Sequence, residues 1–205
     1  MQWWHEPKSF SGDGIILTHG AGSNADAPLL RALGEAFADA GMLVLRYDLA
    51  YREARPHGSP FPANAARDRE SIQKAAETMR ARASRVIAGG HSYGGRQSSM
   101  VAAENPAMAD ALLLLSYPLH PPGKAHQPRT DHFAQLRTPA FFAHGTRDPF
   151  GSVEEMRAAL KLVAARTELL VIEGAPHGVP PRNAAEIVKR FCAFVGPRMH
   201  ADSHG

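Results

Sequence analysis

The stretch Gly90–Gly94, with the sequence GHSYG, constrains the fold of this chain more than any other segment. It follows the apolar run Val86–Ala88, which is typical of a buried strand, and precedes a helix-like segment at Gln97–Glu104. A G-x-S-x-G in that context predicts a tight strand-to-helix turn with Ser92 at its tip, in a strained backbone conformation. Because glycines carry no Cβ, neighbouring backbone can pack closely against the turn. We therefore predict that the Ser92 hydroxyl projects above a sheet.

Strand-like and helix-like segments alternate nearly end to end, which predicts one α/β domain over residues 1–205, with poorly structured ends at 1–14 and 197–205. The expected strands are short continuous apolar runs, as in a parallel sheet covered on both faces. They are Ile15–Thr18, Met42–Tyr47, Val86–Ala88, Ala111–Ser116, Pro139–Ala143 and Glu168–Ile172. The expected helices have apolar residues spaced by three or four. They are Pro28–Ala40, Asp68–Arg80, Gln97–Glu104, Val153–Ala164 and Asn183–Val195. The sequence thus predicts a doubly wound, mostly parallel sheet with helices on both faces.

Two further residues follow the chain order that is typical of a site built on such a turn, which is serine, acid, histidine. Asp148 follows the predicted strand Pro139–Ala143, and His177 follows the next one. A serine hydroxyl is nearly un-ionised at neutral pH, so a histidine must accept its proton and later return it to the leaving group. A carboxylate then selects the imidazole tautomer and stabilises the imidazolium. We predict Ser92 as nucleophile, His177 as base and Asp148 as the acid that orients it.

Two backbone amides are candidate donors to a developing oxyanion. The Tyr93 N–H lies at the start of the predicted helix, where it has no intrahelical partner. The second donor is expected in the turn HGAG, which spans residues 19–22 and follows the strand Ile15–Thr18. Ala21 is the predicted donor, and its neighbour Gly22 stays open as the alternative.

Other polar residues near these turns have a structural interpretation. Asp48 could be the acid, but it precedes the serine and is interpreted as a partner that closes the turn after its own strand. Glu173 lies four residues before His177, which is too local to align the imidazole. Three histidines next to the motifs are expected to pack or hydrogen-bond structurally rather than touch substrate. They are His19, His91 and His144.

Composition and charge exclude several other classes of function. The formal net charge of +3 and the pI near 9.2 come without a basic helix or a nucleic-acid-binding motif, so nucleic acid is not an expected partner. The first residues lack a basic segment followed by an apolar core, and no run approaches the roughly 20 apolar residues that span a membrane. Cys192, the only cysteine, is expected to pack in the core. A reduced cytoplasmic setting fits these observations.

No metal or cofactor is expected. The chain has no cluster of cysteines and histidines with metal-ligand spacing. His200 and His204 in the tail would make only a weak, adventitious site.

Taken together, these residues resemble the α/β-hydrolase superfamily from about Ile15 to Phe194. The segments that carry the resemblance are 17–22 (LTHGAG), 51–54 (YREA), the GHSYG turn continued through Arg96, 116–124 (SYPLHPPGK), 145–151 (GTRDPFG) and His177. More narrowly, the chain looks like the small bacterial hydrolase-like proteins related to the testis-expressed hydrolase-like protein and to a subunit of the nonspecific-lethal chromatin complex.

The resemblance implies serine-hydrolase geometry, although the substrates of that group are largely undefined and some relatives look like subunits of complexes. Those relatives often carry Ser-Met-Gly at the turn, whereas this chain carries the Ser92-Tyr93-Gly94 common in esterases. Only 14 residues precede the first strand, so the usual leading strand pair is expected to be absent or abbreviated. The segment between Ser116 and Ala140 is too short for a large helical lid.

The sequence therefore predicts a serine hydrolase that cleaves carboxylic esters of small substrates through an acyl-enzyme, with no cofactor. Thioester cleavage would use the same residues. The competing hypothesis is a non-catalytic protein-interaction module that retains the fold.

Basic residues gather in the loops that follow the predicted strands. They are Arg52, Arg55, His57, Arg96, Lys124, His126, Arg129 and Arg147. Arg52, Lys124 and Arg129 are predicted to bind substrate, and an electropositive mouth would favour an anionic ester. The alternative is a solvated basic surface with some arginines held in turn-closing contacts.

Overall fold

The structure, a computed structural model, describes residues 1–196. The expected poorly structured end at 197–205, and with it His200 and His204, lies outside the described residues. No helix within the described part of the chain is long and apolar enough to cross a membrane.

Seven strands form one sheet in the order β1-β3-β2-β4-β5-β6-β7. Their bounds are β1 Gln2–His5, β2 Asp13–Thr18, β3 Leu43–Tyr47, β4 Arg85–His91, β5 Ala111–Leu115, β6 Ala140–Gly145 and β7 Thr167–Ile172. All neighbouring strands are parallel except β1, which runs antiparallel to β3 at the edge of the sheet. The predicted α/β class with a mostly parallel sheet is confirmed.

The described residues form six α-helices, of which the first five lie between strands and α6 follows β7. They are α1 Pro28–Asp39, α2 Ala50–Ala54, α3 Ala65–Arg80, α4 Tyr93–Glu104, α5 Val153–Leu160 and α6 Ala184–Val195. Four short 3-10 turns supplement them, at Pro62–Asn64, Pro106–Met108, Phe133–Gln135 and Pro181–Asn183. The element α2 and the 3-10 turns are too short to show a helical period in the sequence.

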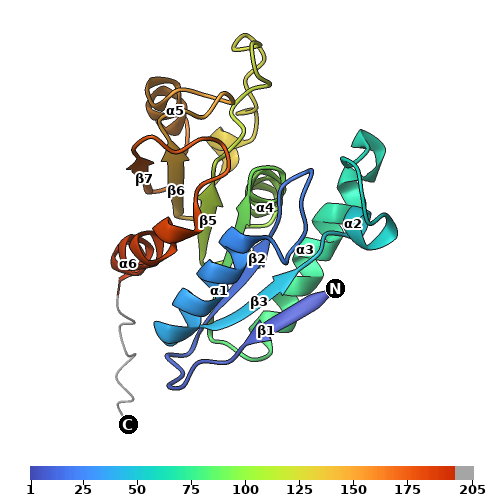
Figure 1. Cartoon of the computed structure of the whole chain (residues 1–205), viewed down its shortest axis with the longest axis vertical. Coiled ribbons are helices and arrows are strands. Elements are labelled where there is room, and N and C mark those ends of the chain that lie inside the picture. Colours follow the sequence, from blue (N-terminus) through green and yellow to red (C-terminus); the bar gives the residue numbers. More distant parts are fainter. Residues whose placement is uncertain (197–205) are drawn as a thin grey trace.

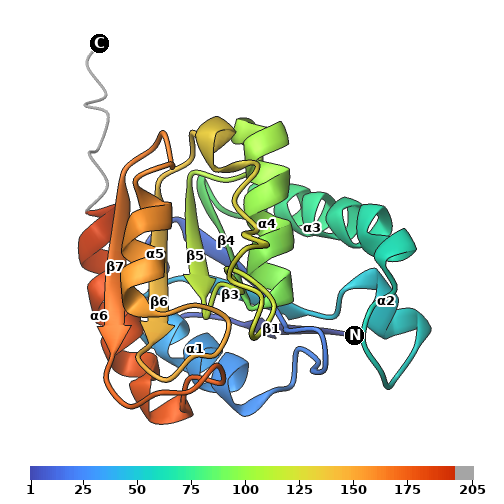
Figure 2. The ribbon, with the colours of Figure 1, turned by 90° about the horizontal axis from the view of Figure 1, so that it is seen from above.

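The helices cover both faces of the sheet (Figures 1 and 2). Helices α1 and α6 pack on one face, where Phe37 and Phe191 meet edge to face with ring centroids 5.8 Å apart. Helices α3, α4 and α5 pack on the other face. Successive residues of β5 alternate between the two cores, with Leu112 on one side and Leu113 on the other. Because both sides are buried, the strands read as continuous apolar runs.

The first strand corrects the prediction for residues 1–14. Gln2–His5 pairs with β3, and Arg46 Nε donates a hydrogen bond to His5 Nε2 at 2.8 Å. Trp4 packs against the core on the face of the sheet that α3 covers, and the guanidinium of Arg82 lies 4.5 Å from the centroid of the Trp4 ring. A four-residue edge strand with the sequence QWWH has too little period to be recognised before its partner β3 is known.

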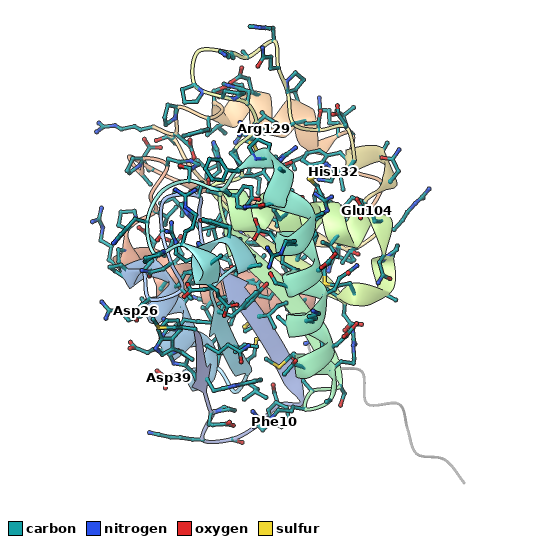
Figure 3. The ribbon with its side chains drawn as sticks, turned by 90° about the vertical axis from the view of Figure 1, so that its right-hand side faces the viewer. Phe10, Asp26, Asp39, Glu104, Arg129 and His132 are labelled. Carbon is teal, nitrogen blue, oxygen red and sulfur yellow. The ribbon has the colours of Figure 1, made fainter. Side chains whose placement is uncertain are left out.

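The connection between β5 and β6, residues 116–139, is a long loop that contains only the 3-10 turn Phe133–Gln135. It projects from one end of the molecule (Figure 1, yellow-green). Figure 3 shows Arg129 and His132 of this loop at the end opposite to Phe10. No helical lid is formed there, as expected.

Candidate active site

Ser92 lies at the end of β4 and is the residue that precedes α4. Its φ of 50° is in the left-handed region, which a residue with a side chain rarely adopts. The Ser92 amide donates to Leu115 O at 2.8 Å, so the turn is tied to the end of β5. A Cβ at Gly94 would lie 2.6 Å from His19 O, and one at Gly90 would lie 2.6 Å from the amide nitrogen of Gly95. Both glycines are therefore required for the close packing that holds this strained turn.

Ser92, His177 and Asp148 form one hydrogen-bonded line. His177 Nε2 lies 2.8 Å from Ser92 Oγ, and His177 Nδ1 lies 2.8 and 3.0 Å from the two carboxylate oxygens of Asp148. A carboxylate accepts, so the ring proton sits on Nδ1 and Nε2 is left to accept from the Ser92 hydroxyl. The Asp148 side chain is fully buried, whereas that of His177 is 21% exposed. The buried carboxyl group of Asp148 thus lies behind the partly exposed imidazole, on the side opposite to Ser92.

Backbone contacts between two loops hold Asp148 and His177 together. Arg147 N donates to Ala175 O at 2.9 Å, and Thr146 N donates to Ile172 O at 3.1 Å. A Cβ at Gly145 would lie 2.2 Å from Ala175 O, so only glycine permits this approach. The ends of β6 and β7 are thus packed directly on each other, which brings residues 29 positions apart in the sequence into contact.

The two predicted oxyanion donors lie beside Ser92. Ala21 and Tyr93 both line the cavity that contains Ser92, and Gly22 is not among its lining residues. Within residues 1–196, neither amide donates to a backbone or side-chain acceptor. Tyr51 Oη lies 3.0 Å from Gly20 O and 2.8 Å from Ala21 O, and its one proton is shared between them. Because a trans peptide directs its N–H opposite to its C=O, the N–H groups of Ala21 and Gly22 both point away from Tyr51. Ala21 lines the cavity and Gly22 does not, which favours Ala21 as the donor.

The cavity beside Ser92 has a volume of about 450 Å³. Its walls come from α3, α4, the segment before α3 and the β5–β6 connection. The lining residues besides Ala21, Ser92 and Tyr93 are Ser59, Pro60, Phe61, Pro62, Ala65, Arg69, Arg96, Gln97, Met100, Pro118, Arg129 and Phe150.

Of the three residues predicted to bind substrate, the structure brings only Arg129 to this cavity. Arg52 is wrongly predicted, because it is 6% exposed and donates to the carbonyls of Ser23, Arg55 and Gly58 at 2.7, 3.0 and 2.9 Å. Lys124 is exposed in the β5–β6 connection and does not line the cavity, so its predicted contact with substrate stays a prediction.

Two arginines in the cavity wall are absent from that prediction. Arg96 follows Ser92 by one helical turn of α4, a spacing that could have identified it. Arg69 lies on α3 and its Nη1 donates to Gln97 Oε1 at 3.3 Å. No sequence signal connects Arg69 with Ser92, because their proximity arises from the packing of α3 on α4.

The neighbouring histidines have structural hydrogen bonds. His19 Nδ1 lies 2.9 Å from Gly20 O, and His19 Nε2 accepts from Leu49 N at 3.1 Å. His91 Nε2 lies 2.9 Å from His177 O. Burial lowers the pKa of both His19 and His91, so both are neutral at pH 7. His144 is fully buried, and its Nε2 lies 2.7 Å from Gly151 O.

The other acids have partners of their own. Asp48 Oδ1 accepts from Ala25 N at 2.8 Å, which places this carboxylate in the turns after β2 and β3 rather than beside His177. Glu173 Oε1 accepts from Thr146 Oγ1 at 3.2 Å. Among residues 1–196, no three His, Cys, Asp or Glu side chains are grouped to hold a metal ion. Cys192 is a half-buried free thiol packed beside the α1–α6 core.

Residues 12–190 match the family model of the alpha/beta hydrolase domain, and the chain belongs to this family. Among solved structures, it is similar to Est1E from Butyrivibrio proteoclasticus with bound ferulic acid, with a TM-score of 0.75 and 18% identity over 94% of each chain. It is also similar to an α/β serine hydrolase without lid from Xanthomonas campestris, with a TM-score of 0.76 and 15% identity over 97% of this chain and 90% of that one. A dienelactone hydrolase from Anabaena variabilis has a TM-score of 0.72 and 19% identity over 94% and 88% of the two chains. At these identities the likeness concerns the fold.

Proposed function

We propose that this protein is a serine hydrolase that cleaves carboxylic esters of small substrates through an acyl-enzyme. The observation that carries the proposal is the line Asp148–His177–Ser92, which has contacts of 2.8 Å at both steps and opens into a cavity. The Ala21 and Tyr93 amides, unpaired beside the same serine, add the donors that acyl transfer requires.

The first half of the reaction transfers the acyl group to Ser92. Ser92 Oγ attacks the ester carbonyl carbon while its proton passes to His177 Nε2, and the carbonyl oxygen becomes an oxyanion held by the Ala21 and Tyr93 N–H groups. The C–O bond to the alcohol then breaks, and His177 returns the proton to the departing oxygen. Asp148 stabilises the imidazolium between these two steps.

The second half removes the acyl group. Water attacks the acyl carbon as His177 Nε2 accepts its proton, and the proton returns to Ser92 Oγ when the acid leaves. The same steps cleave a thioester, with a thiol as leaving group. The cavity volume of about 450 Å³ and the absence of a helical lid between β5 and β6 favour small substrates that enter directly from solvent.

The alternative is a non-catalytic interaction module. This alternative follows from the narrower resemblance to relatives of the testis-expressed hydrolase-like protein and the nonspecific-lethal complex subunit, because some of those relatives look like subunits of complexes. That narrower resemblance stays a prediction. A module without catalysis has no need for a strained serine at φ 50° with a histidine 2.8 Å from its hydroxyl, so these features favour the enzyme.

Labelling with a fluorophosphonate probe and hydrolysis of p-nitrophenyl acetate test the proposal. We expect the purified protein to label and hydrolyse, and Ser92→Ala to do neither while keeping its circular dichroism spectrum. Ser59→Ala is the matched control, because Ser59 lines the same cavity and has no histidine partner among residues 1–196. Absence of labelling in the wild type, or labelling that persists in Ser92→Ala, would contradict the proposal.

A further inference from the structure

Three arginines from three different elements meet in the cavity that contains Ser92. Arg69 comes from α3, Arg96 from α4 and Arg129 from the β5–β6 connection. None of the residues that line the cavity is acidic. The cavity therefore has a local excess of positive charge beside the candidate nucleophile.

These three arginines lack the ion pairs that other arginines of the chain make. Within residues 1–196, no carboxylate oxygen lies within 4.0 Å of a guanidinium nitrogen of Arg69, Arg96 or Arg129. Elsewhere the pairs are short. They are Arg80–Asp110 at 2.7 Å, Arg82–Glu6 at 2.8 Å, Arg85–Asp13 at 2.6 Å and Arg190–Glu168 at 2.7 Å. The cavity arginines are thus available to pair with an anion from outside the chain.

Arg96 has an additional unused donor. Its Nε is buried and has no hydrogen-bond partner among the described residues. A buried donor without a partner is unfavourable, and a bound anion that accepted from it would relieve this cost.

The positive charge of Arg96 acts on two neighbouring side chains. Burial lowers the pKa of Arg129, and repulsion from Arg96 lowers it further. Burial, with repulsion from Arg96, also lowers the pKa of His132 to about 4, which keeps that imidazole neutral at pH 7. In both cases the repulsion from Arg96 indicates positive charge close to these residues, and at His132 it acts against the opposite effect of Asp131.

The remaining cavity wall defines the rest of the ligand. Phe61, Met100, Pro118 and Phe150 are apolar and line the same space as the arginines. Arg96 follows Ser92 by four residues on α4, which is about 6 Å along the helix axis. A ligand of several carbon atoms could therefore place its reacting carbonyl at Ser92 and an anionic group near Arg96, with its chain on the apolar wall.

We propose that Arg69, Arg96 and Arg129 form a carboxylate-binding subsite, and that the preferred substrates are esters with a free carboxylate several bonds from the scissile carbonyl. A guanidinium matches a carboxylate through two parallel hydrogen bonds, which provides orientation as well as attraction. The statement about substrates rests on the proposed hydrolase function. The binding statement does not, because an anion can bind without being cleaved.

A matched pair of esters tests the substrate statement. Mono-p-nitrophenyl adipate and p-nitrophenyl hexanoate share a six-carbon acyl chain and a leaving group, and differ in the terminal carboxylate. With spontaneous hydrolysis subtracted, we expect kcat/KM for the adipate to exceed that for the hexanoate at least tenfold at about 20 mM salt, and less at about 500 mM. The double variant R96Q/R129Q should bring the ratio below about twofold. The ratio cancels any general loss of activity in the variant.

Lys124→Gln is the matched control for charge. It removes one positive charge from the same connection that carries Arg129, and Lys124 does not line the cavity. The ester ratio should stay within about twofold of the wild-type value in this variant. If Lys124→Gln lowers the ratio as much as R96Q/R129Q does, or the wild type shows no preference, a diffuse basic surface explains the charge and the subsite is overturned.

Calorimetric binding to Ser92→Ala separates the subsite from catalysis. We expect monomethyl adipate to bind at least tenfold more tightly than methyl hexanoate, and R96Q/R129Q in the same background to remove the difference. Binding of the adipate together with a wild-type protein that cleaves neither ester supports the subsite and contradicts the hydrolase. Cleavage of both esters at equal rates, with equal binding, supports the hydrolase and overturns the subsite.

Discussion

The phenyl ring of Phe150 stacks on the imidazole of His177, with ring centroids 4.1 Å apart and 29° between the planes. The amide of the same residue donates to Asp148 Oδ1 at 2.9 Å. Phe150 therefore contacts both partners of the Asp148–His177 pair, one through its side chain and the other through its backbone. His177 is held in the ring plane by Asp148 and across the ring face by Phe150, which restricts its rotation.

Replacing Phe150 by leucine should slow the chemical step without unfolding the protein. Loss of the stacked ring removes about 1 kcal/mol of the stabilisation that holds the His177 ring in its orientation, which corresponds to a roughly fivefold lower rate. We expect the maximal rate of fluorophosphonate labelling, measured at saturating probe, to fall by this factor. Phe61→Leu is the control, since Phe61 lines the same cavity and contacts Arg55 rather than His177. An equal decrease in both variants would show that cavity shape, and not His177 orientation, is responsible.

Asp148→Asn should lower kcat by about 10⁴ while the fold is retained, by analogy with the same change in a serine protease. An asparagine amide can hydrogen-bond the wrong imidazole tautomer and cannot stabilise the imidazolium. Steady-state hydrolysis of p-nitrophenyl acetate and the circular dichroism spectrum provide the measurements. Asp48→Asn is expected to affect kcat much less, because Asp48 bonds to Ala25 N. A larger loss in Asp48→Asn, with its stability preserved, would assign the acid to Asp48.

Ser116→Gly should stabilise the protein. Ser116 has φ 47°, is fully buried and has an Oγ without a hydrogen-bond partner among residues 1–196. Glycine removes both the left-handed strain and the unpaired hydroxyl, so we expect a gain of about 1 kcal/mol and a rise in Tm of ~2–4 °C. Ser116→Ala keeps the strain and removes only the hydroxyl, so its gain should be smaller. A lower Tm for Ser116→Gly than for the wild type would show that this backbone is not strained.

Stability should decrease as the pH falls from 7 to 5. The pKa of His132 is lowered to about 4 by burial and by Arg96, so the unfolded chain binds a proton near pH 6.5 that the folded protein does not bind. The unfolding free energy therefore rises with pH between about 4 and 6.5 and is constant above that range. His132→Gln should reduce the loss at pH 5 by about 1 kcal/mol, a figure discounted for the partial exposure of the ring. Urea unfolding at both pH values measures this, and an unchanged loss in the variant would exclude His132 as a source.

Much of this arrangement could be predicted from the sequence because local patterns encode it. Asp148 and His177 each follow an apolar run, and the carboxyl ends of parallel strands meet at one edge of the sheet. The structure places His177 beside Ser92 and Asp148 on the other side of the His177 ring. Helix α4 begins at Tyr93, four residues before the apolar period becomes visible, because Gly94 and Gly95 dilute the helical signal.

The arginines could not be assigned from the sequence. Arg52 lies on the short helix α2 after β3, and Arg129 lies in the loop after β5. Arg52 is buried against backbone carbonyls, whereas Arg129 lines the cavity. Where a guanidinium points depends on which acceptors the fold brings within its reach, and these come from distant segments. The contact of Arg69 with Gln97, 28 residues away, is of the same kind.

The contacts of Arg52 affect which residues of the cavity wall can be substituted, in evolution or in design. It holds the backbone of the segment that leads to the cavity, through Ser23, Arg55 and Gly58, while the tip of that segment, 59–62, lines the cavity. The residues that support the wall are thus different from those that shape its surface. Substitutions at 59–62 can therefore change the shape of the cavity without disturbing either the support of its wall or Ser92. If the proposed function is correct, substrate selectivity can diversify independently of the reaction.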